Sequence, residues 1–573
     1  MDDENKLQAE VISVYPDKIE VLIDKIEDYK YADNSLKVGS YLQIYDNENS
    51  IIISVIENFS IIVNEKGDKL YKLQSRPLGI LKGDNFIRGG DSIAIPPKTA
   101  EIATEESIKK IYMSNIEEKN KFVFSRLANL NNILVPVDGN KFFNKHIAIV
   151  GSTGSGKSNT IAKIIQKAVE EKNGDYNLNN SHVIIFDIHS EYKKAFPNAT
   201  YIDINSLNLP YWLLNSEELE ELFIDTEAND YNQRNILKEA IVKNKKFYSV
   251  EEKDKIHYDM PVFFDINEVV TYIENRNNEK NNKELNKVEW IDDGTKIHLE
   301  EKGEDILFKK NVQACNGTTT NTQNGRFINF LNRLENKIND KRYNFLLGEK
   351  SKSISFEETL KNLLGYKEEN ESNVIIFDLS GIPFEVLSIT VSLISRIIFE
   401  YGYYYKRLKE IENSSDTVSN DVPVLLVYEE AHRYVPKSDL SKFRASRNSI
   451  ERIAKEGRKY GVTLLLSSQR PSEISETIFS QCNNFIAMRL TNPNDQNYVK
   501  KLLPDVMGGM IDKIQSLQAG EALIIGDSIV VPSLVKIEEC INKPSSVDIP
   551  YFDLWKEKWK DIDFKKLEKE WHK

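Results

Sequence analysis

Cysteine is scarce in this 573-residue sequence, and long apolar runs are missing. Its three cysteines, Cys315, Cys482 and Cys540, lie far apart and show no CxxC or Cys/His spacing. We therefore expect neither a disulfide framework nor a structural zinc site, and a reducing compartment fits. The longest apolar runs, such as Val422–Val427, are far shorter than the ~20 residues that cross a bilayer. No membrane partner is expected.

Positive charge is also in deficit, since 76 Lys and Arg face 89 Asp and Glu, a formal net charge of −13. This balance argues against a protein that coats nucleic acid with its whole surface, but it allows a basic channel inside an acidic shell. The acidic start MDDENKLQAE has neither the basic segment nor the apolar segment of a signal peptide. A cytoplasmic location is therefore expected. At roughly 150 residues per domain, the length predicts several domains.

Hydrophobic periodicity divides the chain. The first hundred residues alternate with a period near two between turn signals such as Lys66-Gly67-Asp68, which predicts a small antiparallel barrel. From His146, buried strands alternate with amphipathic helices, the pattern of a parallel α/β sheet. The predicted domains are a β-barrel (1–100), a first core part with its connector (101–208), a helical insertion (209–344), a second core part (345–545) and a C-terminal arm (546–573).

The segment His146–Ser158 contains GxxxxGK[ST] between a buried strand and a helix. In such a loop, successive backbone N–H groups surround phosphates, Lys157 reaches the β- and γ-phosphates, and the Ser158 hydroxyl ligates Mg²⁺. A glycine-rich turn that binds nothing would not require the complete spacing. ATP and Mg²⁺ are the predicted cofactors. The predicted nucleotide contacts are Gly151, Ser152, Thr153, Gly154, Ser155, Gly156, Lys157, Ser158 and Asn159.

A second buried strand, starting at Val422, ends in the carboxylates Glu429 and Glu430. Paired carboxylates at a strand end can hold a metal shell and polarise a water molecule. We predict that Glu429 contacts the metal through water and that Glu430 is the general base. The alternative for Glu430 is an acidic residue at the start of a helix, where negative charge is favourable.

A third strand, Val462–Ser467, is followed by Gln469, whose amide can hydrogen-bond the attacking water or the γ-phosphate. The alternative for Gln469 is an ordinary polar loop residue. Shortly before this strand, Arg458 lies between two glycines in Glu456–Gly461. An arginine supplied by a neighbouring subunit would neutralise transition-state charge, although a surface salt bridge is the alternative.

Five motifs in a fixed order resemble the HerA/FtsK branch of the RecA-like motor ATPases, and specifically the HerA type. They are Gly151–Ser158, Asp187–Tyr192, Tyr428–Tyr434, Glu456–Gly461 and Ser468–Ser472. The resemblance covers residues 1–545. It implies an α/β fold with a RecA-like P-loop core, a HAS-type N-terminal barrel and a helical insertion. It also implies a hexameric ring that moves duplex DNA through a central channel, and a partner effector, often a nuclease.

The resemblance assigns further residues. Asp187 and Glu191 match the family's acidic motif, with Asp187 expected near the metal and water. Lys145 stands where many relatives place Arg before the His, and a nucleotide contact by its point charge is expected. The tail resembles an arm that braces the adjacent subunit. For Trp555 and Trp559, packing onto the chain's own core is an equally open alternative.

Contacts to DNA are inferred from charge alone. The stretch Pro436–Arg447 carries Lys437, Lys442, Arg444 and Arg447, which would line a pore and bind backbone phosphates without sequence preference. An exposed helix face fits the same pattern.

These observations predict a Mg²⁺-dependent ATPase that forms a ring, expected to be a hexamer, and translocates on or unwinds double-stranded DNA with a partner such as a nuclease. The alternative is a ring-shaped platform that organises and activates a sirtuin-like NADase or a nuclease in antiphage defence. In that case the barrel would be the docking surface, and a partner rather than DNA would stimulate hydrolysis.

Overall fold

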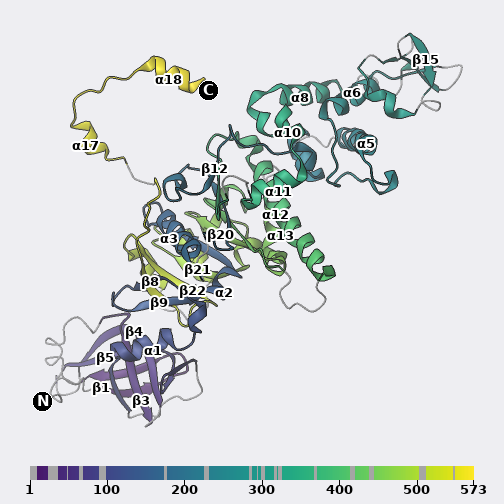
Figure 1. Cartoon of the computed structure of the whole chain (residues 1–573). Coiled ribbons are helices and arrows are strands. Elements are labelled where there is room, and N and C mark those ends of the chain that lie inside the picture. The colour runs from purple at the N-terminus through teal and green to yellow at the C-terminus, as the bar shows by residue number, and fades with distance from the viewer. Residues whose placement is uncertain are drawn as a thin grey trace.

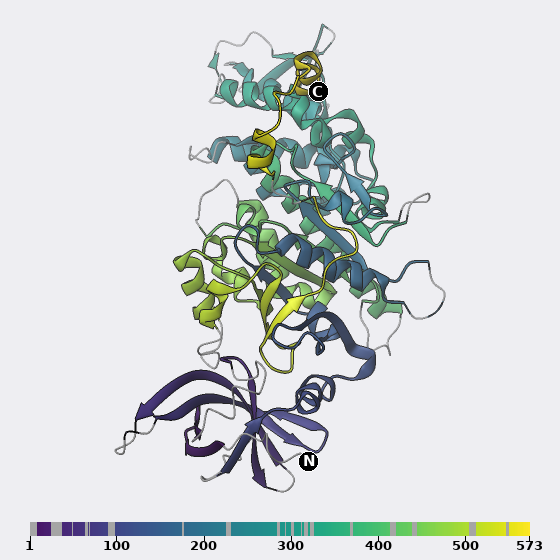
Figure 2. The ribbon, with the colours of Figure 1, turned by 90° about the vertical axis from the view of Figure 1, so that its left-hand side faces the viewer.

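The computed structural model shows a β-barrel, a central α/β sheet and a projecting insertion, arranged in that order along the molecule (Figure 1, Figure 2). The model describes residues 9–23, 37–47, 50–63, 67, 69–89, 98–172, 174, 177–224, 231–282, 287–292, 294–298, 303–310, 312–314, 319–320, 326–366, 371–412, 420–437, 444–502, 511–545 and 549–572.

The N-terminal barrel has seven strands in the order β2-β1-β7-β3-β4-β5-β6, and pairing between β2 and β5 closes it. Its strands are β1 (Ala9–Val14), β2 (Ile19–Ile23), β3 (Tyr41–Asn47), β4 (Ser50–Val63), β5 (Lys69–Lys82), β6 (Asn85–Arg88) and β7 (Lys98–Ile102). Inward-facing Val21, Leu42 and Leu73 pack in its core. The predicted antiparallel barrel is confirmed.

A connector joins the barrel to the central sheet. It contains α1 (Glu105–Met113), β8 (Lys121–Leu127), β9 (Leu134–Asp138) and α2 (Gly139–Phe143). The Tyr112 hydroxyl of α1 lies 2.8 Å from the Tyr41 hydroxyl in the barrel and 2.7 Å from Ser533 Oγ in the central sheet. These buried contacts tie the barrel to the core.

The central sheet has eleven strands in the order β12-β18-β11-β19-β20-β10-β21-β22-β23-β8-β9. The first seven run parallel, and the last four extend the sheet in antiparallel fashion. The strands not yet bounded are β10 (His146–Val150), β11 (His182–Asp187), β12 (Thr200–Ile202), β18 (Val374–Asp378), β19 (Val424–Tyr428), β20 (Val462–Ser468), β21 (Cys482–Ala487), β22 (Glu521–Gly526) and β23 (Ser533–Ile537). The predicted α/β core is confirmed.

Both faces of the sheet are covered, which explains the continuous apolar runs of its strands. Ile147 and Ile149 pack with Ile161 and Ile164 of α3 (Lys157–Glu170), whereas Ala148 belongs to the core on the other face. The remaining core helices are α12 (Phe384–Glu412), α13 (Arg444–Glu456), α14 (Glu476–Phe479) and α15 (Pro493–Leu502).

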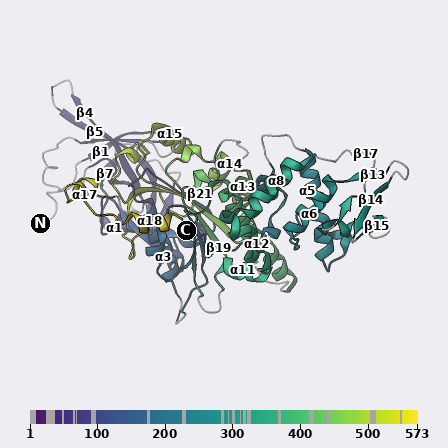
Figure 3. The ribbon, with the colours of Figure 1, turned by 90° about the horizontal axis from the view of Figure 1, so that it is seen from above.

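The insertion projects from the core on the side away from the barrel (Figure 3). Its helices are α4 (Ser216–Phe223), α5 (Tyr231–Tyr248), α6 (Ile266–Asn277) and α8 (Ile328–Asn339), followed by α9 (Asn344–Leu347), α10 (Glu349–Ser353) and α11 (Phe356–Leu364). A small sheet adds β13 (Lys280–Asn282), β14 (Lys287–Asp292), β15 (Thr295–His298), β16 (Gln313–Ala314) and β17 (Thr319–Thr320). The insertion is therefore not purely helical. Trp290 and Ile297, which are both buried, lie opposite each other on the paired strands β14 and β15.

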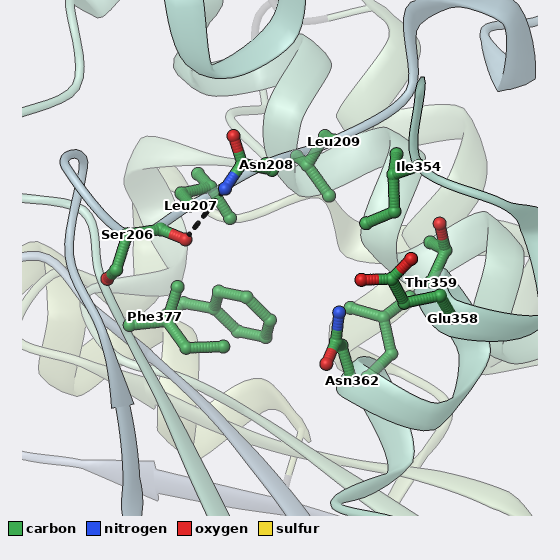
Figure 4. Close-up of a pocket in the computed structure, with 11 residues that line it drawn as sticks. Ser206, Leu207, Asn208, Leu209, Ile354, Glu358, Thr359, Asn362 and Phe377 are labelled. Carbon is green, nitrogen blue, oxygen red and sulfur yellow. Dashed lines mark hydrogen bonds between the residues drawn. The ribbon is translucent and has the colours of Figure 1, made fainter. Parts of the chain in front are cut away.

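A cavity of about 340 Å³ lies where α11 meets the end of the central sheet, lined by Leu207, Asn208, Glu358 and Phe377 among others (Figure 4).

The domain boundaries predicted from the sequence stay a prediction.

The C-terminal segment holds α17 (Tyr551–Trp555) and α18 (Phe564–Trp571), and every described residue from 549 to 572 is exposed. Trp559 is 99% exposed, so it does not pack onto the chain's own core. No helix within the described ranges is both long and apolar enough to span a membrane.

Candidate nucleotide site

Four neighbouring parallel strands, β11, β19, β20 and β10, bring the predicted site residues to one edge of the sheet. Because the carboxyl ends of parallel strands meet there, the segments that follow them lie together. These segments carry Asp187, the Glu429–Glu430 pair, Gln469 and the loop Gly151–Gly156.

The loop after β10 is shaped by glycine. Gly156 has φ 105°, a conformation that other residues rarely adopt. A Cβ on Gly151 would lie 2.5 Å from Ser155 Oγ and 2.9 Å from Met488 Cβ, so a side chain has no room there. The loop leads directly into α3, whose N-terminal N–H groups favour an anion.

Lys157 is buried beneath this loop. Its Nζ donates to the Gly151 carbonyl oxygen at 2.9 Å and lies 4.0 Å from Glu430 Oε1. Burial lowers the pKa of Lys157, while Glu430 and Glu429 oppose the shift. A phosphate oxygen can replace the carbonyl as the acceptor, so the ammonium group is placed for nucleotide binding.

Buried carboxylates gather beside this lysine. Asp187 accepts hydrogen bonds from the backbone N–H groups of Glu191 and Tyr192 at 3.1 and 2.9 Å, and burial raises its pKa. The pKa of Glu429 is raised well above its usual value by burial and then by Asp187 and Glu191. Glu429 Oε2 has no hydrogen-bond partner within the described parts of the chain. A cation bound beside these carboxylates would reduce the repulsion between their negative charges.

The residues present fit a magnesium ion held mainly by the nucleotide. The described residues contain no group of three or more His, Cys, Asp or Glu side chains arranged as a metal cage. Mg²⁺ in phosphate sites needs only one or two carboxylates, because phosphates and water complete its shell. The unpaired Glu429 oxygen and Ser158, the second residue of α3, supply that chemistry.

Glu430 and Gln469 lie at the ends of adjacent strands. Glu430 has φ 47°, which is strained for a non-glycine residue. Its Oε2 accepts from the Gln469 backbone N–H at 3.4 Å, and Thr153 Oγ1 donates to Gln469 Oε1 at 2.8 Å. The Gln469 side chain therefore touches the loop, as a residue that senses the nucleotide must.

Several predicted residues lie elsewhere. Lys145 precedes β10 and pairs with Asp527, and the exposed Arg458 lies in a 3₁₀ turn (Gly457–Tyr460) just before β20. Both therefore lie at the sheet edge opposite the loop and cannot reach a nucleotide in the same chain. Asn159 turns its Oδ1 toward Cys540 Sγ, 3.3 Å away.

The predicted DNA contacts are only partly described. Lys437 pairs with Glu476 at 2.6 Å, Arg447 pairs with Glu451 at 3.0 Å, and Arg444 is exposed at the start of α13. Lys442 lies outside the described residues. Their role stays a prediction.

Sequence reasoning missed two contacts at the site. His432 Nδ1 lies 3.3 Å from Glu430 Oε2 and 3.1 Å from Ser468 Oγ. Thr491, after β21, lies with Oγ1 3.0 Å from Ser152 Oγ and donates its backbone N–H to that oxygen. The signal for both was a polar residue a few positions after the end of a buried strand, but the strand order that brings them to the site was needed.

The fold and this edge of the sheet define a P-loop ATPase. Residues 122–398 match the family model described as the central domain of the helicase HerA. This segment is therefore similar to the central domain of HerA, and the chain is an ATPase of the helicase class.

Relatives match over most of the chain. The DNA double-strand break repair helicase HerA of Pyrococcus furiosus is 26% identical over 545 residues, covering 89% of this chain and 86% of that protein. Its namesake in Sulfurisphaera tokodaii is 27% identical, covering 93% and 94%. Among solved structures, VirB4 of Thermoanaerobacter pseudethanolicus is similar, with a TM-score of 0.44 and 14% identity, covering 76% of this chain and 98% of that one.

Proposed function

We propose that this protein hydrolyses ATP with Mg²⁺ and works as a ring-shaped motor on double-stranded DNA. The observation that carries the proposal is the convergence of Lys157, Glu430 and Gln469 on one phosphate-binding loop. The relatives named as DNA double-strand break repair helicases support duplex DNA as the substrate.

In the proposed mechanism, the loop N–H groups and Lys157 bind the β- and γ-phosphates. Ser158 and Glu429 would hold Mg²⁺, which when bound would neutralise phosphate charge. Glu430 accepts a proton from the attacking water, and Gln469 orients that water or the γ-phosphate. Asp187 stays hydrogen-bonded to its own loop and adds negative charge beside the metal position.

The proposed ring assembly is supported by residues that lie away from the loop. Arg458 and Lys145 lie at the opposite sheet edge, where they would face a nucleotide bound by a neighbouring subunit. The exposed aromatic side chains of α17 and α18 fit an arm that packs on a second copy. We propose a hexamer, with Lys437, Lys442, Arg444 and Arg447 facing DNA.

The nucleotide site is tested with Lys157→Ala. Loss of the buried ammonium group should reduce ATP hydrolysis at least 100-fold, because the phosphates lose their main cation. Lys167→Ala, on the same helix but paired with Glu171, is the matched control and should retain activity. Unchanged turnover in the Lys157 variant would exclude this site.

A second candidate function is a platform that activates an effector protein, either a nuclease or a sirtuin-like NADase of an antiphage system. The β4–β5 hairpin favours it, because it protrudes from the barrel with Phe59, Ile61 and Val63 exposed (Figure 3). Stimulation of hydrolysis by the partner but not by duplex DNA would support this candidate. Stimulation by DNA alone would support the motor.

A further inference from the structure

His432 lies between the two strand ends of the site. It belongs to a 3₁₀ turn (Ala431–Arg433) directly after Glu430, and its side chain is 12% exposed. Its Nδ1 lies 3.3 Å from Glu430 Oε2 and 3.1 Å from Ser468 Oγ. A carboxylate only accepts hydrogen bonds, so a favourable contact requires a proton on Nδ1. Burial lowers the pKa of His432, which favours the neutral ring.

Ser468 connects the ring to the sensor strand. It is the last residue of β20, it is fully buried, and its Oγ accepts the Arg470 backbone N–H at 3.0 Å. The next residue, Gln469, contacts both Glu430 and Thr153 of the phosphate-binding loop. The imidazole therefore joins the end of β19 to the end of β20 at the point where β20 reaches the nucleotide.

Without this ring, little would hold the Glu430 carboxylate in place. Its strained backbone does not give the side chain the direction of a regular strand. Among the described residues, its Oε2 would keep the 3.4 Å hydrogen bond from the Gln469 N–H. Its Oε1 lies 4.0 Å from the Lys157 ammonium group, which would attract the carboxylate away from the attacking water.

We propose that His432 is a positioning residue that holds the Glu430 carboxylate through Nδ1–H and couples it to Ser468 and Gln469. This inference rests on the proposed function, in which Glu430 is the general base. The proposal gives these two nearby residues different roles: Glu430 accepts the proton, and His432 holds the Glu430 carboxylate in place.

The two ring nitrogens allow a specific test. The amide nitrogen of Asn takes roughly the place of Nδ1, whereas that of Gln takes roughly the place of Nε2. We expect His432→Asn to keep the kcat for ATP hydrolysis within about threefold of the wild type. His432→Gln and His432→Ala should lower it by about 10- to 100-fold, within the range of general-base effects. The KM for ATP and the thermal midpoint should stay unchanged in all three.

Equal activities of the Asn and Gln variants, or full activity of the Ala variant, would overturn the proposal. A parallel loss of folding in all three would be resolved with Ser468→Ala, which removes the second contact of Nδ1 and should lower kcat alone. Glu430→Gln distinguishes the two hypotheses. If it retains hydrolysis, the proposed base is wrong; if it abolishes hydrolysis while the His432 variants are fully active, only the positioning role fails.

Discussion

His146 shows how one buried ring can join three elements. At the start of β10, its Nδ1 accepts the Leu464 backbone N–H at 3.1 Å, and its Nε2 lies 2.9 Å from the Ala454 carbonyl oxygen of α13. Because Nδ1 is the acceptor, Nε2 carries the proton and donates. Burial, partly opposed by the Ala454 contact, lowers the pKa of His146 to about 4.

This pKa predicts a pH dependence of stability. The unfolded chain binds a proton at His146 below about pH 6.5, whereas the folded protein resists protonation down to about pH 4. The stabilisation is therefore complete above pH 6.5 and is lost as the pH falls toward 4, by about 1.4 kcal/mol for each pH unit. Thermal unfolding between pH 7 and 5 measures it.

His146→Gln is the comparison for that measurement. The variant should be less stable at pH 7 but should lose less stability on acidification than the wild type. Identical pH dependence in the two proteins would contradict the assignment.

At the same scale, local sequence predicts Lys157, Ser158, Glu430 and Gln469 as site candidates, because each follows a strand with a recognisable motif. Their catalytic roles stay predictions. The contact of His432 with Ser468 could not be predicted, because it depends on the hydrogen-bond geometry between two strands that lie 36 positions apart in sequence at this contact.

Among the elements, α4 of the insertion and α12 of the core are joined by a buried ion pair. Arg396 Nε lies 3.1 Å from Glu218 Oε1, and Nη2 lies 2.8 Å from Oε2. The Glu218 side chain is fully buried, and it also closes the capping box of α4 with Asn215. The pair therefore fixes where the insertion leaves the core.

Arg396→Ala should lower the free energy of unfolding by about 3–5 kcal/mol, because it leaves the Glu218 carboxylate buried without its cation. Chemical denaturation measures this change. Arg342→Ala is the control, since the Arg342 side chain is largely exposed and its pair with Asp340 should contribute little to stability. A loss no larger than in the control would show that solvent reaches Glu218.

The element pattern could be predicted where apolar periodicity is strong, as in β10, β18, β19 and β20. It failed in the insertion, where Lys280–Asn282 is short and polar and Lys287–Asp292 follows a stretch rich in Asn, Glu and Lys. The antiparallel extension β22-β23-β8-β9 was also not predicted, since it joins residues before the P-loop to residues near the end of the core.

For the whole molecule, the arm is the feature with the clearest assembly consequence. Because no described residue from 549 to 572 is buried, deletion of 549–573 should leave the thermal midpoint of the monomer unchanged. The same deletion should remove or weaken the ring, if these aromatic side chains pack on a second copy. Native mass measurements with and without ATP test both expectations. If the deletion variant forms a ring as stable as that of the full chain, the arm does not pack on a second copy and must bind another partner.

The place of β10 in the central sheet has a consequence for synthesis on the ribosome. Its neighbours β20 and β21 begin at Val462 and Cys482. More than 300 further residues must therefore be synthesised before the strand that leads into the P-loop can pair. The barrel, in contrast, has all its strands by Ile102. The nascent chain therefore folds its barrel first and holds an incomplete sheet with an unpaired apolar strand until translation is nearly finished, which is the period when chaperone binding would protect it.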